Sequence, residues 1–212
     1  PAKARATAEQ ALKVDKTNAA AAAIVAEVAA TGGTVEKVEP LVAMMTLVTN
    51  SPNGVGDDAA RGLWYLGDIL YRQFKAIPAE KIEEKVGALQ QMQPVFQQAA
   101  SMGSPEWAVA SLWRIGSGLQ HIADAVETTP APAGLKPTEI EQFRAAVKAQ
   151  VDPLKANANS TFATCVSRAE ALEVFSTAVI GFRKKLDDVP SPLRGLPPER
   201  AVNVEELQKK AE

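Results

Sequence analysis

A helical period, broken repeatedly by glycine and proline, constrains this chain more than any other feature. Apolar residues recur at spacings of three and four through most of the sequence. The period-two alternation of β-branched residues that marks strands is absent beyond a few residues. Turn-forming residues gather at 32–33, 50–54, 102–105 and 127–135. The pattern predicts an all-α protein whose helices are joined by turns.

The breaks divide the chain into a series of expected helices. Their ranges are 2–14, 19–31, 35–48, 57–75, 79–100, 105–126, 137–167 and 169–186, with a short helix over 204–211. Asn18 is the expected N-cap of the second helix, because its short side chain can accept from a free backbone N–H. Pro40 lies too deep in the third range for the first helical position, so that helix is either kinked or begins nearer Glu39. Pro94 and Pro153 predict bends in the fifth and seventh helices.

Composition and charge exclude several classes of protein. The formal net charge of −2 gives no electrostatic footprint for nucleic acid. One cysteine, Cys165, forbids an internal disulfide, which fits the cytosol and equally a periplasmic protein without bridges. No run reaches the ~18 apolar residues of a membrane span. Because the chain opens at Pro1 instead of a methionine, we expect a processed or trimmed piece whose targeting segment, if any, is missing.

An internal repeat links three of the expected helices. Its copies read Ala22-x-x-Val25-Ala26-x-x-Ala29, Leu63-x-x-Leu66-Gly67-x-x-Leu70 and Leu112-x-x-Ile115-Gly116-x-x-Leu119. Each copy keeps a small residue between two apolar rows, which lets a partner helix approach closely. Helix pairs stacked in this way form a solenoid, since one pair cannot bury its own apolar face.

The join between the first two expected helices resembles the join between two tetratricopeptide repeats. Residues 11–19 read Ala-Leu-Lys-Val-Asp-Lys-Thr-Asn-Ala, which is similar to the end of one such repeat and the start of the next, with Lys16 in place of the usual proline. Gly67, Gly116 and Ala26 match the small residue in the first helix of these repeats. The resemblance implies that 2–14 is the second helix of a repeat whose first helix is missing, at the tail of a longer array.

The spacing of the copies departs from the family pattern. Successive copies are 41 and 49 residues apart, against ~34 in regular repeats. The later helices are therefore longer than standard, and we expect an irregular superhelix. We divide the chain into helix pairs over 1–126, long helices closing the solenoid over 127–188, and a Pro-rich linker with a short helix over 189–212.

The second half resembles a narrower group. The resemblance lies in Leu112–Leu119, in 130–135, in Glu139, Glu141, Phe143 and Arg144, and in 152–155. These segments are similar to the closing part of large repeat proteins of myxobacteria and their relatives, several of them tied to the cell envelope and one to gliding motility. The resemblance implies a periplasmic or outer-membrane-associated protein, with the cytoplasm as the alternative.

The inventory of reactive side chains is sparse. His121 is the only histidine, and we interpret it as a surface or groove residue instead of a catalytic base. We expect Cys165 to pack as a small buried residue. Gly116 and Gly118 lie inside a helix, so their spacing is a packing feature and no phosphate loop. No metal or cofactor site is expected, and the chain is expected not to be an enzyme.

The resemblance also implies a binding groove. In tetratricopeptide repeats the first helices line a concave surface, and the residue after the first apolar position of the motif faces it, with those four and seven further on. Carried onto this chain, the groove residues are Trp64, Asp68 and Tyr71 in one copy and Trp113, Ser117 and Gln120 in the other. Trp and Tyr are typical interface anchors. The alternative for Trp64 and Trp113 is that they fill contacts between long helices.

The sequence thus leaves three functional hypotheses. The first is a non-enzymatic scaffold that binds protein partners, in a larger bacterial envelope-associated assembly. The second is an enzyme or small-ligand-binding domain with a pocket between the C-terminal helices. The third is a structural end-cap without a partner of its own. The identity of any partner and the oligomeric state are open at this stage.

Overall fold

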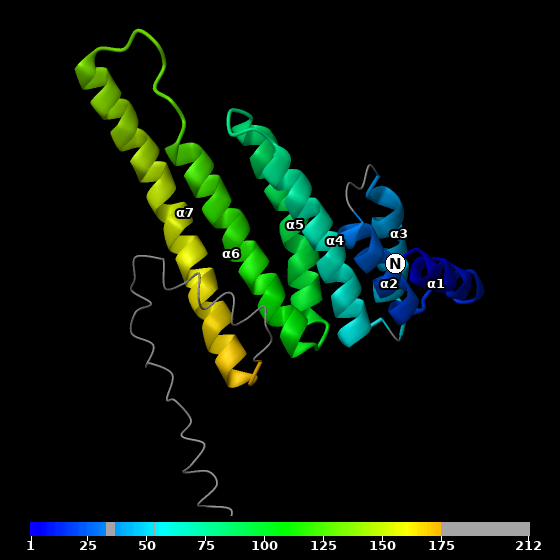
Figure 1. The fold of residues 1–212 in the computed structure, drawn as a ribbon. Coiled ribbons are helices and arrows are strands. Elements are labelled where there is room, and N and C mark those ends of the chain that lie inside the picture. Colours follow the sequence, from blue (N-terminus) through cyan, green and yellow to red (C-terminus); the bar gives the residue numbers. More distant parts are fainter. Residues whose placement is uncertain (33–36, 53, 175–212) are drawn as a thin grey trace, which may run out of the picture.

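Every regular element in the part of the chain that the structure describes is an α-helix. The computed structural model describes residues 1–32, 37–52 and 54–174. Its helices are α1 (Ala2–Val14), α2 (Ala19–Thr31), α3 (Glu39–Thr49), α4 (Asp57–Ala76), α5 (Ile82–Ser101), α6 (Pro105–Glu127) and α7 (Pro137–Ala171) (Figure 1). The prediction of an all-α protein is confirmed.

Most helix boundaries lie close to the expected ones, and two depart for local reasons. α3 begins at Glu39, so of the two alternatives for Pro40 the later start is correct. α5 begins at Ile82, because a turn in which the Lys81 N–H donates to the Pro78 carbonyl at 3.1 Å precedes it. α4 and α6 end within one residue of the expected position.

The expected break between the seventh and eighth helices is wrong. α7 runs through residues 167–169 without interruption and ends at Ala171. This stretch contains no proline, which would remove a backbone N–H donor, and no glycine, which would weaken the helix. Pro94 and Pro153 both lie inside continuous helices. The remainder of the expected eighth helix, the Pro-rich linker and the short C-terminal helix lie outside the described residues, as does the expected start of the third helix at 35–36.

Polar side chains fix several helix starts. Asn18 Oδ1 accepts from the Ala21 N–H at 2.9 Å, which confirms it as the N-cap of α2. Glu139 Oε2 accepts from the Lys136 N–H at 2.7 Å at the start of α7. The buried Ser104 hydroxyl, just before α6, donates to Asp57 Oδ1 at 2.7 Å. This last bond ties the first residue of α4 to the start of α6, two segments far apart in the sequence.

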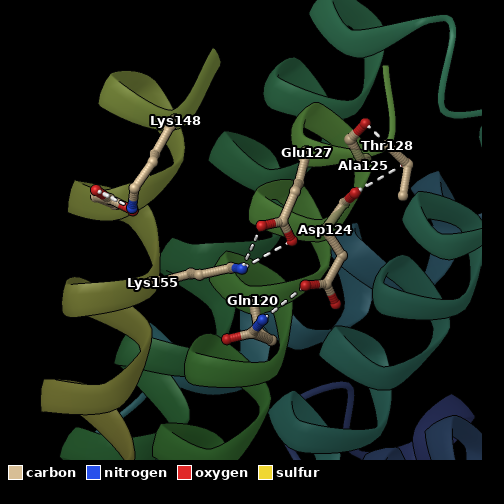
Figure 2. A network of polar contacts seen from close by, with 8 residues as sticks. Gln120, Asp124, Ala125, Glu127, Thr128, Lys148 and Lys155 are labelled. Atoms are coloured by element: carbon tan, nitrogen blue, oxygen red, sulfur yellow. Dashed lines mark hydrogen bonds and ion pairs between the residues drawn. The ribbon is translucent and has the colours of Figure 1, made fainter. Parts of the chain in front are cut away.

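The helices α2, α4 and α6 form a row, and the other helices of the described chain pack against this row. Each helix packs against the next in sequence, and α2, α4 and α6 also pack against one another in that order. α1, α3, α5 and α7 therefore each contact members of the α2–α4–α6 row (Figure 1). At the C-terminal end of α6, Lys155 Nζ of α7 donates to both carboxylate oxygens of Glu127 at 2.8 and 2.7 Å and so joins the two helices (Figure 2).

Two repeated glycines provide the notches into which neighbouring helices fit. A Cβ built on Gly67 of α4 would lie 2.7 Å from a ring carbon of Phe96 in α5, and one on Gly116 of α6 would lie 2.7 Å from a ring carbon of Phe162 in α7. Both phenylalanines are buried. Ala26, at the corresponding position of α2, is fully buried. The small residue of the repeat therefore serves close approach, as the sequence predicts.

The core changes in character along the row. Around α1–α3 it consists largely of alanine and valine packed on Met45 and Leu63. Between α4, α5 and α6 it becomes aromatic, with Phe74 and Phe96 fully buried. Between α6 and α7 the core contains Val109, Trp113, Ala158, Phe162, Cys165, Val166 and Ala169.

The notches make a testable prediction about stability. Gly116→Leu forces the Phe162 ring out of a packed site, and we expect the free energy of unfolding to fall by about 1–3 kcal/mol or more. Gly87→Leu is the matched control: this glycine also lies inside a helix, but a Cβ there would meet nothing within 4 Å. Leucine at that position should be neutral or stabilising, because glycine costs ~1 kcal/mol in a helix. Urea denaturation of both variants measures the difference, and equal effects would contradict the notch.

Candidate functional site

Three half-buried aromatic rings gather where α4 meets the start of α6. The ring centroids of Trp64 and Tyr65 lie 5.2 Å apart, edge to face. Trp107 of α6 lies 5.3 Å from Trp64 and 5.8 Å from Tyr65. None of the three is fully buried. The cluster thus combines aromatic packing between two helices with a remaining exposed edge.

Arg114 of α6 extends this cluster along α4. Its guanidinium lies 2.6 Å from Asp68 Oδ1, 4.7 Å from the Tyr71 ring centroid and 5.6 Å from that of Trp64. Arg72, one turn beyond Asp68, approaches the other carboxylate oxygen at 3.4 Å. The Arg114 side chain retains 30% exposure, so its ion pair is partly desolvated while the group still reaches solvent. We call Trp64, Tyr65, Asp68, Trp107 and Arg114 the α4–α6 face.

Neighbouring charges and burial tune the two tyrosines beside this surface. Burial raises the pKa of Tyr65, and the carboxylate of Glu27 in α2 raises it further by charge and by a hydrogen bond. Burial also raises the pKa of Tyr71, against the opposing effects of Arg114 and of a hydrogen bond with Ser117. Both phenols are therefore neutral hydrogen-bonding groups at physiological pH. The Glu27 contact brings α2 to the edge of the α4–α6 face.

One polar atom in the cluster has no partner. Trp64 Nε1 is buried and makes no hydrogen bond within the described residues. A buried N–H without an acceptor costs about 1–3 kcal/mol relative to a satisfied one. The indole therefore sits in a place where an added acceptor would be favourable.

The structure brings four of the six sequence-derived groove residues to one side. Asp68 and Tyr71 contact Arg114, Trp64 lies beside it, and Ser117 hydrogen-bonds to Tyr71. Gln120 lies further along α6, where its amide donates to Asp124 Oδ1 at 2.7 Å (Figure 2). Tyr71 is only 8% exposed, so its contribution to any contact with a partner is through Arg114 and Ser117.

Trp113 lies elsewhere. Its ring centroid is 4.6 Å from that of Phe162 in α7, and its side chain is buried in the α6–α7 core. Of the two alternatives for this residue, the structure supports packing between long helices. The physical reason is the Gly116 notch, which brings Phe162 close enough to cover the indole.

Sequence reasoning did not single out Tyr65, Trp107 and Arg114 as groove residues. Trp107 stands before the repeat motif, at the first turn of α6, so the motif register could not reach it. Tyr65 and Arg114 occupy the same motif position, directly after the predicted groove residues Trp64 and Trp113. A comparison of the two copies position by position would have aligned Tyr65 with Arg114 and could have drawn attention to this motif position.

The two residues considered for chemistry are both drawn into packing. Cys165 is buried and its thiol donates to the Val109 carbonyl at 3.3 Å, while burial raises its pKa to about 12, so the thiolate is suppressed. His121 is half-buried, and its Nε2 lies 3.0 Å from Lys85 Nζ. The expectation that Cys165 packs as a small buried residue is confirmed.

Hollows lie away from the α4–α6 face. A groove of about 530 Å³ between α1 and α2 is lined mainly by alanine, with Thr7, Asn18 and Ile24. A hollow of about 370 Å³ lies between α4 and α5, where Glu84 faces Gln73 and Gln91. Glu84 pairs with Lys81 at 3.0 Å. Glu84 is the one carboxylate among the residues that line these two hollows.

The described part of the chain has neither a cluster of metal-binding side chains nor a helix that could span a membrane. Residues 1–32, 37–52 and 54–174 hold no group of three His, Cys, Asp or Glu side chains that could bind a metal ion. None of the helices described has the length and apolarity needed to cross a bilayer. Comparison with protein-family models, with curated proteins and with solved structures gave no match.

The position of Trp113 predicts the effect of its removal. We expect Trp113→Ala to lower the free energy of unfolding by about 3–5 kcal/mol, because the change leaves a cavity against Phe162 in a closed core. Trp107→Ala removes the same side chain from a half-buried site and should cost clearly less. Chemical denaturation of the two variants at one pH compares them. A Trp113 variant as stable as the Trp107 variant would show that Trp113 does not belong to the core.

Proposed function

We propose that this chain is a non-enzymatic helical-repeat scaffold of the tetratricopeptide type, and that it binds a protein partner through the α4–α6 face. The observation that carries the proposal is Arg114, which stands between Asp68 and the rings of Trp64 and Tyr71 while keeping contact with solvent. Trp, Tyr and Arg are the residues most enriched among interface hot spots. Here they are gathered on adjacent helices and held by one another.

The solenoid part of the proposal draws support from the packing order. α2, α4 and α6 follow one another in a row, and each carries the small residue of the repeat at a buried position. In α4 and α6 this residue receives a phenylalanine from the helix that follows. The same contact made twice by consecutive helix pairs is the signature of stacked repeats.

Rigidity favours the α4–α6 face as a binding surface. The bond from Ser104 to Asp57 and the bond from the Gly56 N–H to the Met102 carbonyl, at 2.7 Å each, hold the starts of α4 and α6 together. Trp107 lies one turn after Ser104, so its ring is positioned by the same anchor. A preordered surface loses less conformational entropy when a partner binds.

The envelope setting is the broader part of the proposal. It rests on the resemblance of residues 104–186 to the closing segment of large myxobacterial repeat proteins. The α4–α6 face is formed by α6, which begins this segment, and by α4, which precedes it. In such an assembly the chain would hold a neighbouring protein in place and carry out no reaction itself.

Site-specific photo-crosslinking tests this function directly. A benzoyl-phenylalanine placed at Trp107 should capture a defined protein from a lysate of the native organism, which mass spectrometry then identifies. The same probe at Phe143, a half-buried aromatic position on α7, is the matched control and should not capture it. Equal capture at both positions would contradict the proposed surface.

Affinity supplies the quantitative test. An aromatic anchor is worth ~2 kcal/mol or more at an interface, which is about thirtyfold in affinity. Trp107→Ala should therefore weaken binding of the identified partner by at least that factor, while its thermal melt stays close to the wild type. Unchanged affinity in a folded Trp107 variant would remove the α4–α6 face from consideration.

A further inference from the structure

A lysine is buried where α4, α5 and α6 meet. Lys85 of α5 is 2% exposed. Its Nζ donates to the Phe74 carbonyl at 3.2 Å, lies 5.1 Å from the Phe74 ring centroid and stands 3.0 Å from Nε2 of His121 in α6. No carboxylate of the described residues forms an ion pair with it. A buried amine without a counter-charge depends on neutral acceptors for its solvation.

The contact between Lys85 Nζ and His121 Nε2 has room for one proton between its two nitrogens. A nitrogen pair at 3.0 Å is a hydrogen bond when one atom donates and the other offers a lone pair. An ammonium can donate to a neutral imidazole, or a neutral amine can accept from the imidazole N–H. If the ammonium and the imidazolium are both present, neither nitrogen has a lone pair and two positive charges stand face to face. The second proton therefore turns an attraction into a repulsion.

The surrounding charges reinforce this limit. Lys75 of α4 acts on both Lys85 and His121 as a like charge, and Asp124 of α6 is the carboxylate that acts on His121 in the opposite sense. Asp124 accepts from Gln120, as Figure 2 shows. On α7, Lys155 forms an ion pair with Glu127 and does not act on this contact. The charges that act on His121 are thus those of two lysines, Lys85 and Lys75, and one acid, Asp124, so a further positive charge is disfavoured.

Both basic groups hold their protons less tightly than usual. Burial lowers the pKa of the Lys85 ammonium, and Lys75 lowers it further. Burial also lowers the pKa of His121 below its ordinary 6.5, with Lys85 and Lys75 adding to the effect and Asp124 opposing it. The unfolded chain, where His121 is free, then binds more protons than the folded chain at a pH just below 6.5. Stability therefore falls as the pH decreases from 6.5 towards the folded-state pKa.

We propose that the Lys85–His121 contact is a proton-sensitive lock. While His121 is neutral, the contact holds α5 to α6 beneath the end of α4, and protonation of the imidazole opens this junction. The lock uses Nε2 of one residue and Nζ of the other, and its opening needs one proton from solvent, which reaches the half-exposed imidazole ring. Since His121 is the only histidine in the chain, the response between pH 5.5 and 6.5 belongs to this one group.

The wild-type protein gives the first test. The imidazole protons of a single histidine need no assignment, so an NMR titration reads the pKa of His121 directly. We expect a value below 6.5. Lys85→Met, which keeps an aliphatic stem of similar length, should move it up towards 6.5, and Lys75→Ala at an exposed position should shift it in the same direction by less. A wild-type imidazole that titrates at or above 6.5 overturns the proposal.

A pair of unfolding curves gives the second test. Between pH 7.5 and 5.5, the wild-type folding equilibrium constant should fall by up to about tenfold, a limit that is approached when the His121 pKa lies well below 5.5. His121→Gln keeps an acceptor without a titratable group, so its loss over the same range should be smaller by that factor. Amide hydrogen exchange at pH 5.5 should be faster at the start of α5 in the wild type than in this variant. An equal pH response of the two proteins overturns the lock.

Discussion

The close approach of phenylalanine to glycine sets the geometry of this molecule. Phe96 enters the notch at Gly67, and Phe162 enters the notch at Gly116. Each contact fixes both the distance and the register between two consecutive helices, because a ring that touches backbone has little freedom to slide. The burial of Trp113 against Phe162 follows from the second contact, while the alignment of α4 with α6 is set by the bond from Ser104 to Asp57. The repeated residue is small because a larger one would separate the helices.

The α4–α6 face is a product of this alignment. The glycine notches face α5 and α7, which leaves the other sides of α4 and α6 to meet each other. There the bond between Ser104 and Asp57 sets the helix starts level, so that Trp107 lies over Trp64 and Arg114 reaches Asp68. The same alignment, further along, places His121 of α6 over Phe74 of α4, with ring centroids 5.2 Å apart, and beside Lys85 of α5. The proposed binding surface and the proposed lock thus lie at successive levels of one helix contact.

The positions of the helices could be predicted from the sequence, but the contacts of individual side chains with distant helices could not. Periodicity, Asn18 and the glycine turns located seven helices, since these signals act within a few residues. Trp113 shows where such reasoning ended: its motif position matches that of Trp64, yet α7 covers one and α6 contacts the other. The partner of a side chain depends on helices far away in sequence, and these are invisible in a local pattern. The pairing of Lys85 with His121 is of the same kind, because neither residue belongs to a recognisable motif.

The notches also separate what must be kept in this chain from what is free to vary. Phe96 follows its glycine after a short connection, whereas Phe162 follows Gly116 only after the long excursion through the tip of the α6–α7 hairpin. The Phe162 ring nevertheless packs against a glycine in the same way as the Phe96 ring does. The extra length lies at the start of α7, which extends beyond the end of α6 (Figure 1). Such a helix pair can gain or lose whole turns near the loop that joins its two helices without disturbing the contact between glycine and phenylalanine. The loop between α6 and α7 is therefore the natural place for grafted sequences or labels.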